Sequence, residues 1–340
     1  MMRYDSLFRS LVDISLIMDK KVKLLITGGA GFIGSNLVEK FIQDSRISLV
    51  RVVDDLSNGY HSNIEKFIGN PKFEFIKADI CDYQVCLEVT NDINKVSHQA
   101  ALGSVPRSIE NPLRSTEVNI LGTVNLMHAC HINKVERIIL ACSSSTYGNS
   151  KKLPKIECSI GAPLSPYAVT KLAVEIFADV FFKIYGLKYI GLRYFNIYGP
   201  KQNLLNPYAA VIPIFCKAFN ENVEPLINGD GEASRDFTHV KNVIHANDLA
   251  LFTNDSRALN EIYNVACGDQ ISLNQMILML KEITGKNISP KYGPERFGDV
   301  KHSKADISKI KQLLGYKVKM PFYEGLKETY DWYNEHQFNE

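Results

Sequence analysis

The stretch that decides the fold is VKLLITGGAGFIG, residues 22–34. Its first five residues, 22–26, form an apolar run that is too short and too β-branched for a helix, so it predicts a buried strand. Three glycines follow at intervals of three, Gly28, Gly31 and Gly34, and apolar side chains at helical spacing come directly afterwards. A strand, a glycine turn and a helix in this order predict the start of a parallel α/β sheet.

The alternation of strand and helix patterns continues through the first 195 residues. The further predicted strands lie at residues 49–53, 73–77, 95–98, 137–142 and 189–193. The predicted helices between them lie at residues 35–42, 113–133 and 167–185. This pattern predicts the α/β fold class, with a Rossmann-type doubly wound parallel sheet at residues 21–195.

The second half of the chain has shorter elements that are separated by prolines. Its predicted helices lie at residues 209–219, 273–284, 307–314 and 322–334. We expect a smaller α/β domain at residues 196–340, which closes over the carboxyl ends of the sheet. Part of the segment 236–265 is expected to return to the first domain, and residues 1–20 are expected to form an N-terminal extension.

Composition and patterning exclude several classes of protein. The 340 residues include 39 basic and 37 acidic side chains, a net charge of +2 without a basic stripe, so a nucleic-acid partner is not expected. No apolar run approaches the roughly 18 residues of a membrane span, so no membrane partner is expected. The 7 cysteines are scattered without a Cys-x-x-Cys pair, which favours a cytoplasmic protein. His128 and His131 have no matching second pair, so no metal site is predicted.

The glycine turn predicts a dinucleotide site. Glycine is favoured there because the backbone must turn tightly, approach a pyrophosphate and let the helix pack on the strand. The helix that follows offers free N–H groups to the phosphates. Asp54 ends the second predicted strand, where a carboxylate binds the adenosine ribose and repels a 2′-phosphate. NAD is therefore predicted in preference to NADP.

A second group of residues indicates acid–base chemistry. Tyr167 and Lys171 are four residues apart, so both side chains are expected on one face of a helix. Free tyrosine has a pKa near 10. A neighbouring ammonium and a positive nicotinamide both favour the phenolate, so we expect Tyr167 to act as a base. Ser143, Ser144 and Ser145 follow a predicted strand, where hydroxyls face the ligand crevice.

Taken as a set, these segments resemble the extended short-chain dehydrogenase/reductases that remodel nucleotide sugars. The resemblance covers residues 21–335. The motifs that carry it are TGGAGFIG at 27–34, Asp54, DI at 79–80, HQAA at 98–101, SSSTYG at 143–148, Tyr167-x-x-x-Lys171 and RYFN at 193–196.

The resemblance implies three groups of site residues. The catalytic residues would be Tyr167, Lys171 and Ser143. The residues that bind NAD would be Gly28, Gly31, Phe32, Ile33, Gly34, Asp54, Asp79, Ile80, Gln99, Ala100, Ala101, Asn119, Tyr167, Lys171 and Phe195. The residues that bind a UDP-sugar would be Gly103, Ser104, Ser143, Ser144, Ser145, Tyr167, Asn196, Val211, Leu226, Asn228, Arg235, Arg296, Asp299 and Ser303.

In the last group, Arg235 and Arg296 with Asp299 are expected to hold the pyrophosphate and the uridine ribose. Guanidinium groups suit this role because they bind a diphosphate through paired hydrogen bonds. A structural ion pair with a nearby acid is the alternative for Arg235.

The serine cluster distinguishes the reactions of this family. Its dehydratases and uronate decarboxylases carry an acidic side chain in that region, whereas this chain has none, so it resembles the 4-epimerases. The resemblance implies that Tyr167 takes the proton of the sugar 4-hydroxyl while C4 passes hydride to NAD. Ser143 would hydrogen-bond the same oxygen, and Lys171 would bind the nicotinamide ribose. The 4-keto sugar then turns and receives the hydride on its other face.

Two other functions stay open. One is a nucleotide-sugar dehydratase or decarboxylase of the same fold, which the missing acid disfavours. The other is a non-catalytic NAD-sensing regulator, which would generally lack the tyrosine or the lysine.

Small side chains favour an N-acetylated sugar. Ser303 stands where glucose-restricted epimerases carry a bulky tyrosine, and Gly103 replaces their usual lysine. With the run at 207–213, this resembles bacterial epimerases of UDP-N-acetylglucosamine or its uronic acid, which supply O-antigen, lipopolysaccharide and capsule. UDP-glucose or UDP-glucuronate is the alternative substrate, and Ser303 as an ordinary loop serine is the alternative for that residue. Arg107 has two interpretations, a carboxylate at C6 or a surface contact.

The resemblance also implies a homodimer. Family members commonly pair two helices from each subunit. In this chain the corresponding helices are those predicted at residues 113–133 and 167–185.

Overall fold

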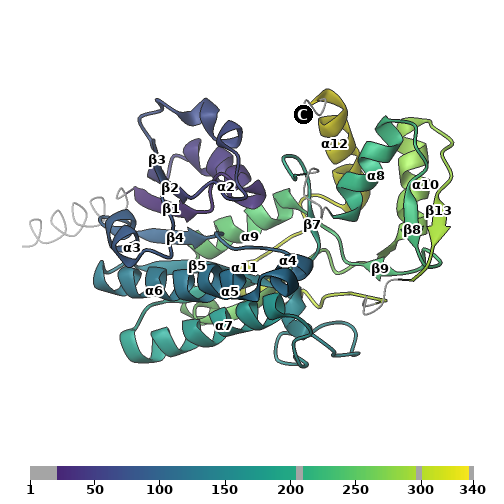
Figure 1. Ribbon diagram of the computed structural model, residues 1–340. Helices are drawn as coiled ribbons and strands as arrows, with labels where there is room; N and C mark the ends of the chain where they lie inside the picture. Colours follow the sequence, from purple (N-terminus) through teal and green to yellow (C-terminus); the bar gives the residue numbers. More distant parts are fainter. Residues whose placement is uncertain (1–20, 204–209, 296–300, 337–340) are drawn as a thin grey trace, which may run out of the picture.

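The computed structural model describes residues 21–203, 210–295 and 301–336. A seven-stranded sheet forms its centre, with the strand order β11-β6-β5-β4-β1-β2-β3 (Figure 1). All neighbouring strands in this sheet are parallel. The strands are β1 (Val22–Thr27), β2 (Ile47–Asp54), β3 (Phe73–Lys77), β4 (Lys95–His98), β5 (Arg137–Ser143), β6 (Tyr189–Tyr194) and β11 (Glu261–Val265). The predicted doubly wound α/β sheet is confirmed.

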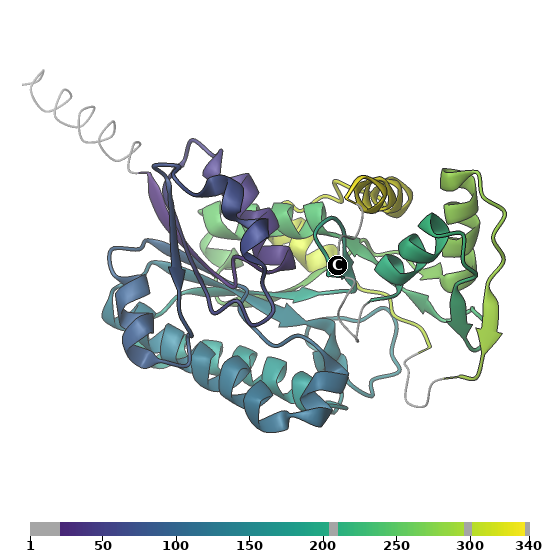
Figure 2. The same cartoon turned by 45° about the horizontal axis from the view of Figure 1, so that its top comes forward.

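Helices cover both faces of the sheet because its strands are apolar on both faces. In β1, Leu24 and Ile26 join one buried cluster and Leu25 joins the other, as the two-residue repeat of a strand requires. The helices on the first face are α2 (Phe32–Ile42), α9 (Val240–Phe252) and α11 (Ser308–Leu314). The helices on the second face are α3 (Tyr83–Thr90), α6 (Thr123–Ile132) and α7 (Pro166–Tyr185). Figure 2 shows the purple α2 and the teal α7 on opposite sides of the sheet.

Two predicted helices differ from the structure at informative points. The helix predicted at 35–42 begins earlier, at Phe32, because extended backbone at Gly31 already forms its N-terminal boundary. The helix predicted at 113–133 is divided. A π-helical segment, η3 (Glu117–Gly122), separates α5 (Pro112–Thr116) from α6. An inserted π turn depends on contacts that helical periodicity does not show.

The elements after β6 form a smaller part beside the carboxyl edge of the sheet (Figure 1). Its apolar core lies between α8 (Val211–Asn220), α10 (Leu273–Thr284), α12 (Phe322–Glu335) and β8 (Leu226–Asn228). Its two-stranded pairs are β7 (Ile197–Tyr198) with β10 (Thr238–His239), β9 (Ser234–Arg235) with β12 (Ile271–Ser272), and β8 with β13 (Lys291–Gly293). The short α4 (Val105–Glu110) lies at the end of the sheet that faces this part.

The chain returns from the smaller part to the sheet through α9 and β11. β11 pairs with β6 at the edge of the sheet. The ammonium of Lys95 in β4 donates to the Leu251 carbonyl at 2.9 Å, and the guanidinium of Arg137 in β5 donates to the Ala250 carbonyl at 2.7 Å. These carbonyls end α9, where positive charge stabilises a helix. Two cations of the sheet therefore hold the C-terminus of α9.

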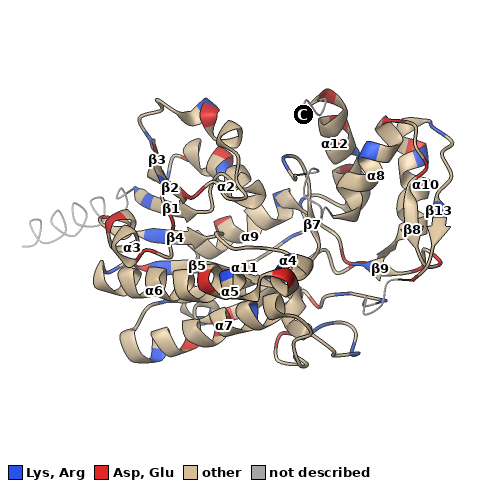
Figure 3. Cartoon of the chain, in the orientation of Figure 1, with Lys and Arg blue, Asp and Glu red and all other residues tan. Residues whose placement is uncertain are grey.

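Charged side chains are distributed over both parts of the molecule. Figure 3 shows basic and acidic residues interspersed along most elements. None of the helices in the described ranges has the length and apolar character needed to cross a membrane.

Candidate active site

A cavity of about 1600 Å³ runs along the carboxyl edge of the sheet. It lies where the strand order reverses between β1 and β4, which is the point where open α/β sheets bind ligands. Loops of the sheet and elements of the smaller part both line it. The predicted site residues on its wall are Gly28, Gly31, Phe32, Ile33, Gly34, Asp54, Asp79, Ile80, Gln99, Ala100, Ala101, Gly103, Ser104, Ser143, Ser144, Ser145, Tyr167, Lys171, Phe195, Asn196, Val211, Leu226, Asn228, Arg235 and Ser303.

One predicted site residue in the described part of the chain, Asn119, is not on this wall. Asn119 is buried behind it, and its side chain accepts from the Leu102 N–H at 2.8 Å and donates to the Thr170 hydroxyl at 3.1 Å. Asn119 therefore joins the loop after β4 to α7, and its contact with the cofactor remains a prediction. Arg296 and Asp299 lie outside the described residues.

The three glycines of the first turn differ in how much space a side chain would have at their positions. Gly28 has a φ of +66°, and a Cβ atom there would lie 2.7 Å from the backbone nitrogen of Ala100. A Cβ atom on Gly34 would lie 2.1 Å from the carbonyl oxygen of Gly28, so the turn and α2 pack too closely for any side chain. A Cβ atom on Gly31 would meet only that same oxygen, at 3.3 Å. The fold itself thus requires Gly28 and Gly34, whereas Gly31 leaves open backbone toward the cavity.

The beginning of α2 fits the pyrophosphate of a dinucleotide. Phe32, Ile33 and Gly34 form the first turn of this helix and line the cavity, and no side chain caps the helix. First-turn N–H groups have no partner inside a helix, and together with the helix dipole they favour an anion. Donors without a cap, beside the open backbone of Gly31, are the features that this cofactor needs.

Two acidic side chains follow the strands beside this turn. Asp54 is buried, and its carboxylate accepts from the N–H groups of Ala30 and Leu56, both at 2.9 Å. Burial raises the pKa of Asp54, although these hydrogen bonds oppose the shift. Asp79 is paired with Arg114 at 2.9 Å. Burial would raise the pKa of Asp79, but the hydrogen bonds from Arg114 and Cys81 and the charge of Arg114 together outweigh it, and the net pKa is lowered.

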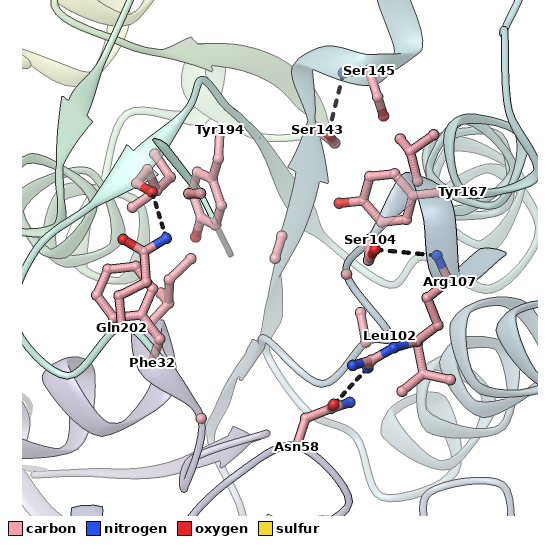
Figure 4. Close-up of a pocket in the computed structure, with 18 of the residues that line it drawn as sticks. Phe32, Asn58, Leu102, Ser104, Arg107, Ser143, Ser145, Tyr167, Tyr194 and Gln202 are labelled. Carbon is pink, nitrogen blue, oxygen red and sulfur yellow. Dashed lines mark hydrogen bonds between the residues drawn. The ribbon is translucent and has the colours of Figure 1, made fainter. Parts of the chain in front are cut away.

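Tyr167 points into the cavity from the first turn of α7 (Figure 4). The Ser165 hydroxyl caps this helix by accepting from the Ala168 N–H, and the Tyr167 N–H donates to the Ser108 hydroxyl at 3.0 Å. Burial raises the pKa of Tyr167, and a hydrogen bond with Ser143 lowers it in part. The geometry therefore brings the predicted tyrosine and serine together at the carboxyl end of β5.

Lys171 lies one turn after Tyr167 on α7. Its Nζ atom is 6.0 Å from the centre of the Tyr167 ring and donates to the Ala141 carbonyl at 2.8 Å. Burial lowers the pKa of Lys171 to about 8. The hydrogen bond of Lys171 is directed to β5, and burial of the phenol is the largest influence on the pKa of Tyr167.

The rest of the serine cluster is only partly hydrogen-bonded. The Ser143 hydroxyl accepts from the Ser145 N–H at 3.1 Å (Figure 4). The Ser145 hydroxyl oxygen is itself buried and has no hydrogen-bond partner among the described residues. A buried hydroxyl in this state is costly unless a ligand supplies the partner.

The smaller part contributes the opposite wall of the cavity. The Arg235 guanidinium donates to the carbonyls of Ser234 and Lys301, both at 3.0 Å, which fixes its position on that wall. The Ser303 N–H donates to the same Ser234 carbonyl at 3.0 Å. Asn196 has a φ of +40°, and its side chain donates to the Asp236 carbonyl at 3.0 Å.

Several lining residues were not assigned from the sequence. The Tyr194 hydroxyl donates to the Gln99 side chain at 3.2 Å and accepts from Asn247 at 2.9 Å. Tyr194 ends β6, so the rule that strand ends face the crevice could have found it. Gln202 and Lys155 also line the cavity, and neither follows a strand of the central sheet. No pattern in the sequence identifies them.

Arg107 of α4 is the residue that the sequence left with two interpretations. Its guanidinium donates to the side chain of Asn58, which lies in the loop after β2 (Figure 4). Both residues line the cavity. The contact joins α4 to that loop along one rim of the cavity.

Comparisons with known proteins agree with this geometry. A family model described as GDP-mannose 4,6 dehydratase matches residues 25–329. A putative UDP-glucose 4-epimerase of Methanocaldococcus jannaschii is 36% identical over 311 residues, which is 91% of this chain and 97% of that protein.

Two solved structures are similar over nearly the whole chain. The first is a UDP-N-acetylglucosamine 4-epimerase from Methanobrevibacter ruminantium in complex with UDP-N-acetylmuramic acid, with 38% identity, a TM-score of 0.86, and coverage of 94% of this chain and 100% of that one. The second is a UDP-glucuronic acid 4-epimerase from Bacillus cereus in complex with UDP-glucuronic acid and NAD, with 32% identity, a TM-score of 0.84, and coverage of 92% and 99%. By its family match, its relatives and its fold, the chain belongs to the nucleotide-sugar-modifying extended short-chain dehydrogenase/reductases, the family of the GDP-mannose 4,6 dehydratase model.

Proposed function

We propose that the protein is a NAD-dependent 4-epimerase that interconverts UDP-N-acetylglucosamine and UDP-N-acetylgalactosamine, or the corresponding uronic acids. The observation that carries this proposal is the pairing of half-buried Tyr167 with Ser143 in a cavity whose sugar end, in the described part of the chain, lacks a carboxylate. Among the described residues that line the cavity, the acidic ones are Asp54, Asp55 and Asp79, which all follow β2 or β3.

Three residues of the chain transfer the proton and hold the sugar and the cofactor in place. Tyr167 removes the proton of the 4-hydroxyl, and Ser143 hydrogen-bonds the same oxygen. Lys171 is fixed beside the tyrosine and binds the nicotinamide ribose. NAD, held by the first turn of α2 and by Lys171, would supply the hydride acceptor and donor for C4 and a positive charge that favours the tyrosinate. The net redox change is zero, so NAD is expected to stay bound through turnover.

The charge distribution of the cavity disfavours elimination and decarboxylation. Dehydration needs an acid that protonates the leaving hydroxyl of the sugar. The serine positions Ser143, Ser144 and Ser145 offer hydroxyls only, and the acidic residues named above lie at the NAD end. A dehydratase or decarboxylase therefore remains the second candidate within the family.

The preference for an N-acetyl group rests on small residues in the cavity. Gly103 and Ser303 both line it and leave volume that larger side chains would fill. The named relatives include epimerases of UDP-glucose, UDP-N-acetylglucosamine and UDP-glucuronic acid, so UDP-glucose and UDP-glucuronate remain the alternative substrates.

The cellular setting is also part of the proposal. We infer a cytoplasmic homodimer that supplies surface polysaccharides such as O-antigen, lipopolysaccharide or capsule. Exposed apolar side chains on α5 and α7 support the dimer, because Leu113, Ile176 and Ile184 are 83%, 57% and 66% exposed.

One experiment tests the reaction and the substrate together. The purified protein is incubated without added NAD with UDP-N-acetylglucosamine, its uronic acid, UDP-glucose or UDP-glucuronic acid, and the anomeric signals are followed by NMR. We expect a 4-epimer from at least one N-acetylated sugar, formed faster than from its unacetylated counterpart. A keto sugar or carbon dioxide as the main product would favour the second candidate. No product from any of the four would reject the proposed function.

A further inference from the structure

Lys155 is a buried cation that the proposed mechanism does not use. It is 6% exposed and lines the active-site cavity. Its ammonium donates to the Ser150 carbonyl, and no carboxylate of the described residues lies within 4.0 Å of it. Burying a charge without an opposite charge is costly, so the position calls for an explanation.

The other buried cations of the described chain have clear partners. Arg193 forms a two-pronged ion pair with Glu175, at 2.9 and 2.8 Å. Arg137 donates to the carbonyls that end α9, and Lys171 belongs to the Tyr-x-x-x-Lys pair of α7. Lys171, like Lys155, donates to one neutral carbonyl and lines the cavity, but its place beside Tyr167 accounts for its charge. The charge of Lys155 has no such explanation.

The backbone of Lys155 is held in place on both sides. Its N–H donates to the Lys304 carbonyl at 2.7 Å, and its carbonyl accepts from the Asp306 N–H and from the Asn264 side chain, both at 2.9 Å. These contacts fix where the side chain starts. The ammonium is therefore positioned in advance, which is a requirement for a group that selects a substrate.

Lys155 lies beside the turn that carries the serine cluster. Its Nζ atom is 6.0 Å from the centre of the Tyr147 ring, and the Tyr147 hydroxyl is already occupied by Asn264 at 2.6 Å. Tyr147 ends the short helix that begins at Ser144 and contains Ser145, whose buried hydroxyl oxygen also lacks a partner. One wall of the cavity thus carries an uncompensated cation and an unused hydroxyl.

We propose that Lys155, together with Ser145, binds a carboxylate that the sugar carries next to its reacting C4 carbon. The inference rests on the proposed function, because Tyr167 and Ser143 place the sugar 4-hydroxyl at this end of the cavity. The ring carbons beside C4 are C3 and C5, so a carboxylate on a substituent of either carbon would lie next to the group that Tyr167 and Ser143 hold. Two anionic groups have the right chemistry, a C6 carboxylate attached to C5 and a carboxylate of a lactyl ether on O3.

A bound carboxylate would accept a charge-assisted hydrogen bond from Lys155 and a second hydrogen bond from the Ser145 hydroxyl. Burial alone lowers the pKa of Lys155, and an anionic partner would reverse that direction. The preferred substrate is therefore an acidic N-acetylhexosamine joined to UDP, which narrows the alternatives left by Gly103 and Ser303.

The test compares kcat/KM for three substrates. These are UDP-N-acetylglucosamine, its C6 uronic acid and UDP-N-acetylmuramic acid, whose carboxylate is on O3. We expect the wild-type protein to prefer one of the two acidic substrates, and that choice identifies which carbon carries the carboxylate. If UDP-N-acetylglucosamine is epimerised faster than both, the inference fails while the proposed function stands. If none is epimerised, the proposed function itself has failed.

Two variants test whether Lys155 is the residue that binds the carboxylate. In Lys155→Met, the ratio of kcat/KM for the preferred acidic substrate to that for UDP-N-acetylglucosamine should fall at least about 30-fold, the range expected when a buried charge-assisted hydrogen bond is lost. The exposed Lys152→Met serves as the matched control and should keep the wild-type ratio. Equal losses for both substrates would show a structural role and overturn the proposal.

Ser145→Ala keeps the inference testable if the lysine variant does not fold. The hydroxyl has no partner in the described structure, so its removal should not lower the melting temperature. We expect the same substrate ratio to fall about 5- to 10-fold, as for the loss of one hydrogen bond. An unchanged ratio in Ser145→Ala would overturn the proposal.

Discussion

The two ends of the cavity are built differently. At the glycine turn, the polar side chains already have protein partners, since Asp54 accepts from backbone N–H groups and Asp79 is paired with Arg114. At the serine turn, Tyr167 is half-buried, and among the described residues Ser145 lacks a partner and Lys155 lacks a carboxylate. The glycine end thus offers its ligand uncapped backbone N–H groups, which many enzymes share, whereas the serine end offers side chains that depend on the sequence. Specificity is therefore expected at the serine end.

The largest effect should come from a change that breaks the glycine end. Gly34→Ala places a Cβ atom 2.1 Å from the Gly28 carbonyl oxygen, so we expect a loss of about 4 kcal/mol or more in the free energy of unfolding. Gly31→Ala is the matched control, because its Cβ would meet that oxygen at 3.3 Å. It should fold within about 1 kcal/mol of wild type and yet retain less NAD. Urea unfolding and the NAD content after denaturation measure both effects. A folded Gly34→Ala protein would contradict the packing argument.

The next effect should come from the serine end. Tyr167→Phe removes the proton acceptor and its hydrogen bond with Ser143, and the ring keeps its packing. We expect kcat to fall by about 10²- to 10⁴-fold while NAD content stays near that of wild type. Single-turnover NMR of the 4-epimer gives the rate. If turnover is retained, Tyr167 is not the base, and the proton transfer cannot be assigned to the serine end.

A smaller effect is expected where the two ends are joined. Asn119 bonds the loop after β4 to α7, so Asn119→Ala should lower the free energy of unfolding by about 1 to 3 kcal/mol, as when buried hydrogen bonds are broken. Asn119→Asp keeps the acceptor for the Leu102 N–H but removes the donor to Thr170 and to the Leu102 carbonyl, so it separates the accepted hydrogen bond from the two donated ones. If denaturant unfolding shows no loss for either variant, the junction is not held by this side chain.

The smallest effect is a pH dependence of the free energy of unfolding that arises near the glycine end. His98 is buried between the hydroxyls of Thr27 and Thr123, at 2.7 and 2.9 Å, and burial lowers its pKa to about 3. Below pH 6.5 the unfolded chain takes up a proton that the folded chain refuses. The stabilisation is therefore complete well above pH 6.5, is lost as the pH falls, and decreases by about 1 kcal/mol between pH 6.5 and 5.5.

His98→Gln should reduce by one the number of protons that the chain takes up on unfolding at acidic pH. The free energy of unfolding is measured by urea titration at pH 7.5, 6.5 and 5.5 for both proteins. We expect the wild-type curve to be steeper than that of the variant between pH 6.5 and 5.5. Equal slopes would mean that another group causes the loss of stability at acidic pH.

Much of the fold could be predicted from the sequence because its strands are local patterns. The strands predicted at 73–77 and 95–98 coincide with β3 and β4, and the helix predicted at 273–284 coincides with α10. The division of the helix predicted at 113–133 could not be predicted. Its π-helical segment contains Asn119, whose partners Leu102 and Thr170 are distant in the sequence.

The candidate site shows the same limit. Residues carried by a motif, such as Tyr167 and Ser143, lie together on the cavity wall. Lys155 could not be recognised, because its position depends on hydrogen bonds with residues 264, 304 and 306. The electrostatics of Tyr167 was also unpredictable, since the spacing of Tyr167 and Lys171 does not show that the lysine donates to β5.

The return of α9 and β11 to the sheet has a consequence for how the molecule unfolds. A fragment ending at residue 195 would expose the edge of β6 and deprive Lys95 and Arg137 of the carbonyls that they cap. Such a fragment is expected to aggregate, because an unpaired strand edge invites other chains. The chain should therefore melt in one cooperative transition, and neither end of the cavity can be lost while the other persists.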